Sequence, residues 1–519
     1  MILTNNDARA VVEFGDYQTP PTFTQFVCQK LRNVHGLSPN VVIEPTFGKG
    51  NFFDGVLDSF PDIQSLYGIE INERYFETVR KKIHDRVANI HTKLFHADIF
   101  TFDFNTIKKN NAKNDSILII GNPPWVTNSQ LSSIESDNLP VKANFKGCTG
   151  LDAMTGKGNF DIAENIILRL LSEFSGYDCT IAMLCKTSVA KNIVRDMKKY
   201  GFSMSVIDLY LFDAEETFNV NCDAGLLVIK LGNQCANFCK VYDFHTNEEK
   251  KQFGWFNNAF YSDFSNLDNS VAVDGISQFE WRQGIKHDCS KVMELKAVDT
   301  DCYQNGFGER CFFDLGTFVY PLVKSSDIKS IEITETRKFV IVPQKKINED
   351  TLRIKEIDRN VWEYLSKHEA LLNARRSSIY QKSPKFAVFG VGNYSFAKYK
   401  VGISGFYKNP IFSLIWNDYP IMLDDTCYFL SFDNITHALI TTALLNSKEN
   451  INFLKSIAFL DSKRPYTKEV LRRIDFVKLT ELVNYTDISK FVRSMPNDHI
   501  TCENDYLAYR QMLKTRLFD

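Results

Sequence analysis

The sequence predicts a doubly wound, mostly parallel α/β sheet in the N-terminal half of the chain and a separate α+β domain in the C-terminal half. Residues 40–231 alternate short apolar runs with helical stretches, and this alternation is typical of a parallel sheet with helices on both faces. Polar side chains follow several of these runs, at the strand ends where ligands of such sheets bind. From Trp281 onward strand-like runs dominate. Helical patterns return near residues 360–376, 434–458 and 465–494.

Seven apolar runs are the expected strands of the N-terminal sheet. They occupy residues 41–44, 66–70, 94–97, 117–120, 180–184, 205–210 and 226–230. Helical patterns such as residues 74–83 and 162–171 lie between them. We therefore expect a first domain over residues 1–250, a polar and turn-rich connector over 251–275, and a second domain over 276–519.

The composition is that of a soluble globular protein, with 44% apolar and 24% charged residues among 519. The N-terminus has no basic region followed by an apolar stretch, and no window approaches 18 uninterrupted apolar residues. We therefore expect neither a secretory signal nor a membrane span. The 12 cysteines and 9 histidines show no CxxC pair and no metal-ligand spacing, which indicates reduced cytosolic thiols, no disulfide framework and no metal site.

The tetrapeptide Asn122-Pro123-Pro124-Trp125 is the most informative motif of the chain. It follows the apolar run 117–121, and two consecutive prolines cannot continue a strand and hold the backbone rigid. Asn122 is held extended because a proline follows it. The motif is thus a stiff platform with one amide, one carbonyl and a large aromatic face, which suits the binding of a flat ring that carries an amino group.

Three acidic residues follow three other expected strands. Glu44 opens a turn over residues 44–53 that contains two glycines but lacks the third glycine of a dinucleotide-binding fingerprint. Glu70 suits a ribose diol, because a carboxylate accepts both hydroxyl protons. Asp98, next to an apolar residue, suits the amino edge of an adenine ring. The order of these four strand ends is far more specific than any one of them.

In this order the motifs resemble those of the S-adenosylmethionine-dependent DNA adenine-N6 methyltransferases, and specifically their gamma class. Residues 14–21 are similar to the motif that precedes the glycine turn in that class, and residues 159–161 to the motif that follows the catalytic tetrapeptide. Phe218 is similar to the second aromatic residue at the flipped base. The chain departs from the family at three positions of the turn, where Asp, Ala and Cys are common, and at Trp125, where Tyr or Phe is commoner.

The resemblance implies a site for each component of the reaction. The implied catalytic residues are Asn122, Pro123, Pro124 and Trp125. The residues implied to bind S-adenosylmethionine are Thr19, Pro20, Glu44, Thr46, Gly48, Gly50, Glu70, Ile71, Asp98, Ile99, Asn122 and Pro124. Phe218 would contact the target base, which must leave the duplex because its amino nitrogen lies inside the stack.

The resemblance also implies the fold and the biological setting. We expect a Rossmann-like, seven-stranded methyltransferase sheet and a C-terminal domain that recognises the target sequence in double-stranded DNA. The expected activity is the modification reaction of a restriction–modification system, with a separate cognate endonuclease in the same cell. We expect a monomer, because a one-strand target is asymmetric, and a prokaryotic cytoplasmic location in association with the nucleoid.

The charge distribution supports a polyanionic partner for the C-terminal half. The net charge of the chain is −2, but the C-terminal half is net positive and the N-terminal half net negative. No acidic residue lies between Glu369 and Asp418, whereas Lys408 and many aromatic residues do. Cations neutralise phosphates and aromatic rings stack on bases. The DNA-binding residues predicted from this stretch are Arg375, Arg376, Lys382, Lys385, Lys398 and Lys400.

Three alternatives remain open from the sequence. Asn-Pro-Pro-aromatic motifs also occur in RNA methyltransferases and in enzymes that methylate a glutamine amide of proteins, although those chains usually lack a large C-terminal domain. A cytosine-N4 enzyme would more usually have Ser or Thr in place of Asn122. A non-catalytic DNA-binding protein with a methyltransferase fold is the third alternative, and the intact Asn122, Glu70 and Asp98 argue against it.

Overall fold

The computed structural model describes residues 18–126 and 161–515, apart from positions 235, 266 and 461. The chain divides into two compact units, Met1–Phe264 and Ser265–Asp519, which are described separately below. No helix within the described ranges is long and apolar enough to cross a membrane.

The first unit is built on one ten-stranded sheet with the strand order β10-β9-β8-β6-β7-β5-β4-β1-β2-β3. Its strands are β1 Val41–Glu44, β2 Ser65–Glu70, β3 His91–His96, β4 Ile117–Gly121, β5 Cys179–Lys186, β6 Met204–Asp213, β7 Asp223–Leu231, β8 Phe238–Asp243, β9 Glu249–Phe256 and β10 Ala259–Tyr261. The strands β1 to β5 pair in parallel, and β7 runs antiparallel between β5 and β6. This is the doubly wound, Rossmann-like sheet expected from the sequence.

The sheet contains three strands more than the seven expected. Residues 251–275, expected to form a connector, supply part of β9, all of β10 and the short helix α11 (Leu267–Val271). β9 pairs with β8 and β10 in antiparallel ladders at the edge of the sheet. Their polar residues resemble a turn-rich linker because strands near the edge of a sheet expose polar side chains to solvent, as β9 does at Glu249 and Lys250.

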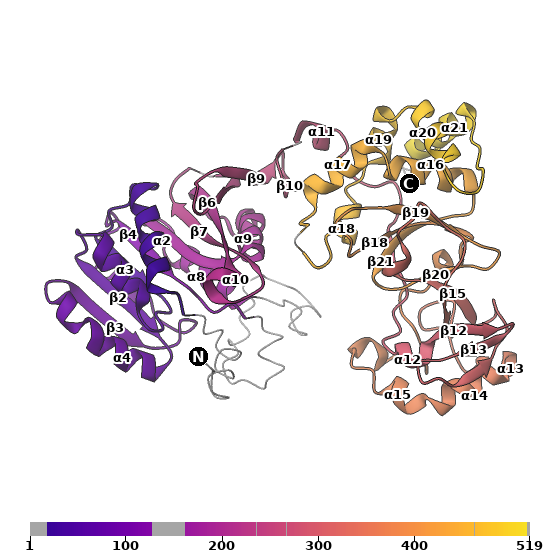
Figure 1. Cartoon of the computed structure of the whole chain (residues 1–519), viewed down its shortest axis with the longest axis horizontal. Helices are drawn as coiled ribbons and strands as arrows, with labels where there is room; N and C mark the ends of the chain where they lie inside the picture. The colour runs from indigo at the N-terminus through magenta and orange to yellow at the C-terminus, as the bar shows by residue number, and fades with distance from the viewer. Residues whose placement is uncertain (1–17, 127–160, 235, 266, 461, 516–519) are drawn as a thin grey trace. The chain divides into compact units, whose positions relative to one another are not determined.

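Helices cover both faces of this sheet (Figure 1). They are α2 Pro21–Asn33, α3 Asn51–Ser59, α4 Glu73–Ile83, α5 Asn105–Lys108, α8 Ile162–Glu173, α9 Thr187–Tyr200 and α10 Ala214–Phe218. One apolar core joins α2, α3 and α4 to one face of the sheet, and a second joins α8 and α9 to the other. The central strands β1 and β4 are buried along their whole length, as expected for parallel strands between two helical layers.

The second unit contains two sheets. The six-stranded sheet has the order β14-β13-β12-β17-β15-β20, and the five-stranded sheet has the order β11-β21-β18-β19-β16. The strands are β11 Arg282–Gln283, β12 Glu294–Asp299, β13 Cys302–Gln304, β14 Arg310–Phe312, β15 Val319–Val323, β16 Glu332–Ile333, β17 Lys338–Ile341, β18 Tyr399–Ser404, β19 Phe412–Trp416, β20 Met422–Leu423 and β21 Cys427–Phe432. The unit is therefore α+β, as its strand-like runs predict.

Most helices of the second unit fall in two groups, one between β17 and β18 and one after β21, whereas α11 and α12 precede β12. They are α12 Ser290–Met293, α13 Ile354–Ile357, α14 Arg359–Lys367, α15 Glu369–Asn373, α16 Ile435–Leu445, α17 Lys448–Ile457, α18 Lys468–Leu471, α19 Phe476–Leu482, α20 Tyr485–Arg493 and α21 Glu503–Thr515. Helix α16 is buried on nearly every side and contacts β18, β19 and β21. Helices α14 and α15, α16 and α17, and α18 to α20 lie in or at the borders of the three ranges where the sequence predicts helical patterns, whereas α12, α13 and α21 lie outside them.

Candidate functional site

The candidate site lies where the winding of the first sheet reverses. Chain order runs outward from β1 through β2 to β3 and then returns to β4 on the other side of β1. Such a switch point leaves a crevice at the carboxyl ends of the two adjacent strands. Glu44 ends β1 and Gly121 ends β4, and a Cβ atom built on Gly121 would lie 3.8 Å from Cγ of Glu44. The glycine turn and the proline tetrapeptide therefore start side by side.

Two glycines shape the turn that follows β1. Gly48 and Gly50 have φ angles of +50° and +69°, in the left-handed region that disfavours other residues. The turn is tied to the segment before α2, because Asn51 donates a hydrogen bond of 2.7 Å to the Thr19 carbonyl and the Lys49 N–H donates one of 3.1 Å to Gln18 Oε1. The structure thus brings Thr19 to the glycine turn, as the sequence predicts, whereas residues 14–17 of the leading motif lie outside the described ranges.

Glu70 organises the same crevice from the end of β2. Its two carboxylate oxygens accept hydrogen bonds of 2.8 Å from the N–H groups of Gly48 and Asn72. Glu44 is buried close by, and burial together with the neighbouring Glu70 carboxylate raises the pKa of the Glu44 carboxyl well above its ordinary value. Two acidic side chains in one crevice lower the cost of binding a cation there.

Two buried oxygens of this crevice are ready to accept hydrogen bonds. Within the ranges that the structure describes, Glu44 Oε2 and Thr46 Oγ1 have no hydrogen-bond partner. Buried polar atoms are rarely left in this state in folded proteins, because an unsatisfied acceptor costs about 1–3 kcal/mol. The two oxygens therefore point to a ligand with hydrogen-bond donors at the start of the glycine turn.

The third predicted acidic residue, Asp98, stands at the turn after β3. Its Oδ1 accepts a hydrogen bond of 2.9 Å from the Phe100 N–H. The two apolar residues predicted beside the acids differ in exposure. The Ile71 side chain is 45% exposed, whereas the Ile99 side chain is 7% exposed and packs in the core under the sheet. Ile71 is thus placed to cover a flat ring, and Ile99 contributes its backbone to the turn.

The proline tetrapeptide follows β4 directly and forms neither helix nor strand. Asn122 and Pro124 are partly exposed, and Pro123 is buried. The Trp125 side chain is only 4% exposed, and its indole N–H donates a hydrogen bond of 3.2 Å to the Leu184 carbonyl in β5. The ring of Trp125 is therefore held against the neighbouring strand, and Asn122 is the residue of the motif that offers a polar side chain to the crevice.

Phe218, at the end of α10, contacts Trp125 directly. The ring centres lie 5.3 Å apart at an interplanar angle of 68°, an edge-to-face contact. Phe218 also touches Phe23 and Phe212 at 6.2 Å and 6.0 Å. The sequence predicts both rings at one site, and the structure brings them together. The direct contact leaves no space for a further ring between Trp125 and Phe218 in this arrangement.

Within the part of the chain that the structure describes, no cluster of three His, Cys, Asp or Glu side chains has the geometry of a metal site. Of the motif predicted at residues 159–161, Asn159 and Phe160 lie outside the described ranges. Asp161 is buried and caps the N-terminus of α8, where its carboxylate accepts a hydrogen bond of 3.1 Å from the Ala163 N–H.

Some residues of the basic stretch in the second unit are exposed to solvent, and others make contacts within the protein. Arg376, Lys382 and Lys398 are exposed. Arg375 donates hydrogen bonds to the carbonyls of Leu372, His287 and Ala387 and lies 3.7 Å above the Tyr380 ring. Lys385 pairs with Glu369 at 2.8 Å but remains exposed. Arg375 therefore stabilises the fold of the loop after α15, and its prediction as a DNA-binding residue does not fit its contacts.

Lys400 is the clearest departure from the sequence prediction. Its side chain in β18 is 1% exposed and donates a hydrogen bond of 2.6 Å to the Ala397 carbonyl. Burial lowers the pKa of Lys400 to about 7. A side chain enclosed in this way cannot reach a phosphate, so the prediction that Lys400 binds DNA is corrected. A count of charges along the chain does not tell which side of a strand is covered.

We expect Lys400→Met to stabilise the protein. The folded state loses the Lys400 proton near pH 7, whereas an unfolded chain keeps it until about pH 10.4. The unfolded state binds more protons between these values, so the stability of the wild type rises with pH across this window and is lowest below pH 7. The variant lacks this term, and its free energy of unfolding in urea at pH 6–7 should exceed that of the wild type by about 1–3 kcal/mol.

The advantage of Lys400→Met should shrink as the pH rises towards about 10, and DNA affinity should be unchanged. Weaker DNA binding with unaltered stability would instead restore Lys400 to the DNA-contacting residues.

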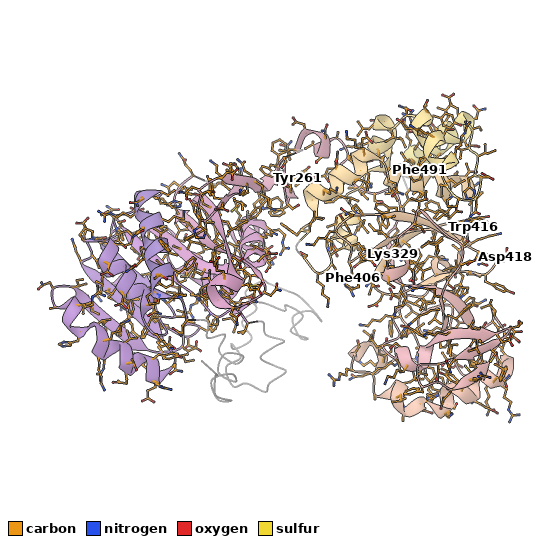
Figure 2. The ribbon with its side chains drawn as sticks, in the orientation of Figure 1. Tyr261, Lys329, Phe406, Trp416, Asp418 and Phe491 are labelled. Atoms are coloured by element: carbon orange, nitrogen blue, oxygen red, sulfur yellow. The ribbon has the colours of Figure 1, made fainter. Side chains whose placement is uncertain are left out.

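Lys408, at the end of the basic stretch, lies near two basic residues that the sequence analysis did not single out, Lys463 and Arg464. The hairpin between β18 and β19 carries Phe406, Tyr407 and the exposed Lys408, and it lies at the opposite end of β19 from Trp416 (Figure 2). The Arg464 guanidinium lies 5.1 Å from the centre of the Phe406 ring, and the Tyr466 hydroxyl donates a hydrogen bond of 2.7 Å to the Lys408 carbonyl. The dibasic Lys463-Arg464 pair before a proline is the sequence signal that could have drawn attention to this loop.

The comparisons with known proteins agree with this geometry. No protein-family model matches the chain. The type II methyltransferase M.NspV from Nostoc sp. (strain ATCC 29411 / PCC 7524) is 38% identical over 488 residues, which are 93% of this chain and all of that protein. This chain belongs to the type II methyltransferases. S-adenosylmethionine is accordingly the methyl donor, and the enzyme is a restriction–modification DNA methyltransferase.

Solved structures show a similar fold for this type II methyltransferase. The type IIL restriction–modification enzyme MmeI, determined in complex with DNA, matches 98% of this chain and 73% of its own chain, with a TM-score of 0.51 and 14% identity. The type IIG restriction endonuclease BpuSI matches 96% of this chain and 66% of its own, with a TM-score of 0.35 and 12% identity. The likeness to MmeI extends over both units of the methyltransferase.

Proposed function

We propose that this type II methyltransferase methylates N6 of a flipped-out adenine at a specific site in double-stranded DNA. The observation that carries the proposal is the position of Asn122. It follows β4 directly at the switch point of the sheet, beside Glu44 and the glycine turn. A methyl donor bound in the crevice and an amino group held by Asn122 would then meet at one place.

The residues of the crevice fit S-adenosylmethionine, which supplies an electrophilic methyl group on a sulfonium. Its ammonium would donate hydrogen bonds to Glu44 Oε2 and Thr46 Oγ1, two oxygens of the crevice that are buried and have no hydrogen-bond partner in the described ranges. Glu70, whose oxygens accept the N–H groups of Gly48 and Asn72 at the same crevice, would accept from the ribose hydroxyls. Asp98 would accept from the adenine amino group, with the exposed Ile71 against the ring.

Asn122 and Pro123 would prepare the target nitrogen. The lone pair of an aromatic amino group is delocalised into the ring, so the nitrogen is a weak nucleophile. The Asn122 amide oxygen and the Pro123 carbonyl oxygen would each accept a hydrogen bond from one N–H of this amino group. These two hydrogen bonds would favour a pyramidal nitrogen whose lone pair points at the methyl group. Positioning and fixed dipoles supply most of the rate in this arrangement, and the two prolines hold those dipoles in place.

Adenine is favoured over cytosine because position 122 is an Asn and not a Ser or Thr. Duplex DNA is favoured over RNA or a protein glutamine because the full-length relative is a type II methyltransferase. Sequencing of modified bases in DNA from cells that express the chain tests the proposal directly. We expect N6-methyladenine at one recurring sequence. N4-methylcytosine would overturn the choice of base, and unmodified DNA from an active, folded enzyme would overturn the substrate.

We further propose that DNA contacts the second unit at the surface formed by residues 405–409 and 462–464, together with the exposed Arg376, Lys382, Lys385 and Lys398. In the described ranges, no ion pair involves Lys408, Lys463 or Arg464. Tyr407 is 37% exposed beside them. Cations next to aromatic rings suit contact with phosphates and bases, although the Asp425 carboxylate lies within electrostatic reach of Arg464.

The double variant Lys463→Ala/Arg464→Ala should weaken DNA binding and reduce its salt dependence. Each lost phosphate contact lowers the slope of log affinity against log salt by about 1, so the slope should fall by about 2. Binding titrations at several salt concentrations measure this slope. The matched control is Arg359→Ala/Lys367→Ala, which removes the same charge from residues paired with Glu363 and Glu309. Equal slopes for the two variants would exclude a specific contact at residues 462–464.

A further inference from the structure

Lys186 lies behind the catalytic tetrapeptide, at the end of β5. Its ammonium donates hydrogen bonds of 2.7 Å to the Trp125 carbonyl and 2.8 Å to Asp161 Oδ2. Asp161 is the N-cap of α8, and the next residue, Ile162, donates its N–H to the Val126 carbonyl at 2.9 Å. Three contacts therefore join the end of the tetrapeptide to the first turn of α8.

The same helix holds the turn after β3. Arg169 donates hydrogen bonds of 2.7 Å to the Ile99 carbonyl and 2.6 Å to the Phe102 carbonyl. Its guanidinium also lies 5.4 Å from the centre of the Phe104 ring. This turn contains Asp98, the residue proposed to bind the adenine of the cofactor. Arg169 is eight residues beyond Asp161, which places the two anchoring points roughly 12 Å apart along the helix axis.

The helix between these two anchors is rigid. Its apolar side is packed into the core under the sheet, and the buried residues are Ile162, Ala163, Ile166, Ile167, Leu168, Leu170 and Leu171. Close-packed cores transmit displacement and do not absorb it. A rigid rod that is fixed to two loops sets the distance between them.

The tetrapeptide has a particular need for an external anchor. Two of its four residues are prolines, which have no N–H to donate. Its carbonyls must therefore be held by donors from elsewhere in the fold. Lys186 supplies a charged donor to the Trp125 carbonyl, and a charge-assisted hydrogen bond is about twice as strong as a neutral one.

We infer that α8 is a brace that fixes the catalytic tetrapeptide relative to the cofactor-binding turn, with Lys186, Asp161 and Arg169 as its positioning residues. The inference rests on the proposed function of the two loops and adds how their separation is set. Methyl transfer needs a near-attack geometry, and a misplacement of about 1 Å costs about 100-fold in rate. Release of the Lys186 anchor therefore slows the transfer step, whereas release of the Arg169 anchor weakens cofactor binding.

The test compares Lys186→Met with wild type in two measurements. Single-turnover methyl transfer is measured on a duplex that carries the site found by modified-base sequencing, and cofactor affinity is measured by calorimetry without DNA. We expect Lys186→Met to slow transfer at least about 10-fold while the cofactor Kd changes less than about 3-fold. Lys186→Arg, which keeps a charged donor, should recover most of the rate. Arg169→Met should instead raise the cofactor Kd about 10-fold, as expected for a displaced binding turn.

Lys108→Met is the matched control. Lys108 donates a hydrogen bond of 2.7 Å to Glu173 at the far end of α8 and is partly buried like Lys186. Its loss should cost similar stability and leave transfer within about 2-fold, because neither partner touches the tetrapeptide or the turn with Asp98. Equal slowing by Lys108→Met would show a general loss of stability and overturn the brace.

Two further outcomes separate the brace from the proposed function. An active wild type together with an equally fast Lys186→Met would overturn the brace alone. A wild type that binds the cofactor but methylates no DNA would overturn the proposed function. If Lys186→Met does not fold, Asp161→Asn provides the same test. The Asn side chain keeps the helix cap but removes the negative charge that holds the Lys186 ammonium. Transfer at the wild-type rate by Asp161→Asn would count against the brace.

Discussion

Asn122→Ala is expected to abolish methyl transfer while it leaves cofactor binding nearly intact. The substitution removes the amide oxygen that would accept a hydrogen bond from the target amino group. The Pro123 carbonyl cannot accept hydrogen bonds from both N–H groups in the same geometry. Loss of one fixed acceptor at a reacting centre costs about 100- to 1,000-fold in rate, and loss of the base-positioning contact adds to this. Transfer should therefore fall by at least about 1,000-fold.

Cofactor affinity should change by less than about 3-fold in Asn122→Ala, because the proposed contacts of Glu44, Glu70 and Asp98 remain. Radiolabelled methyl incorporation measures the first quantity and calorimetry the second. Asn110→Ala is the control variant, because it makes the same substitution at an exposed position of the same unit. Its rate of methyl transfer and its cofactor affinity should both match those of the wild type. Transfer at the wild-type rate by Asn122→Ala would contradict the role proposed for the tetrapeptide.

Trp125→Ala is expected to cause the largest loss of stability. The indole is 4% exposed, packs in the core beside Phe218 and donates to the Leu184 carbonyl. Truncation of a buried Trp to Ala typically costs 3–5 kcal/mol, roughly, through lost packing and the cavity that remains. Trp125→Phe keeps a ring and loses the indole N–H, so its cost should be about 1–3 kcal/mol. Urea unfolding monitored by circular dichroism measures both values.

The Trp125→Phe variant also separates anchoring from stacking. Trp255 offers a matched control, because its indole N–H donates to the carbonyls of Val194 and Arg195 at 3.0 Å and 3.2 Å, away from the crevice. Trp255→Phe should lose similar stability and keep full activity. If Trp125 orients the flipped base, Trp125→Phe should weaken the fluorescence response of 2-aminopurine at the target position. Identical responses of the two variants would leave Trp125 a role in packing alone.

The sequence by itself determined the doubly wound class of the first sheet and the residues that follow its first four strands. Runs such as 117–121 are apolar throughout, because a parallel strand between two helical layers is buried on both faces. The positions of Glu44, Glu70, Asp98 and Asn122 after four such runs then follow from the local pattern. All four lie at the carboxyl ends of β1 to β4, because parallel strands end at one edge of a sheet.

The tertiary structure alone decided what each charged or aromatic side chain touches. Lys400 and Lys398 are two residues apart in one basic stretch, yet Lys398 is exposed and Lys400 is buried and donates to the Ala397 carbonyl. Arg375 donates to three carbonyls, one of which belongs to His287, 88 residues earlier in the chain. Lys186 has no motif around it, and its partner Trp125 is 61 residues earlier. Composition and periodicity report local burial, whereas these contacts depend on strand register and on segments that only the folded chain brings together.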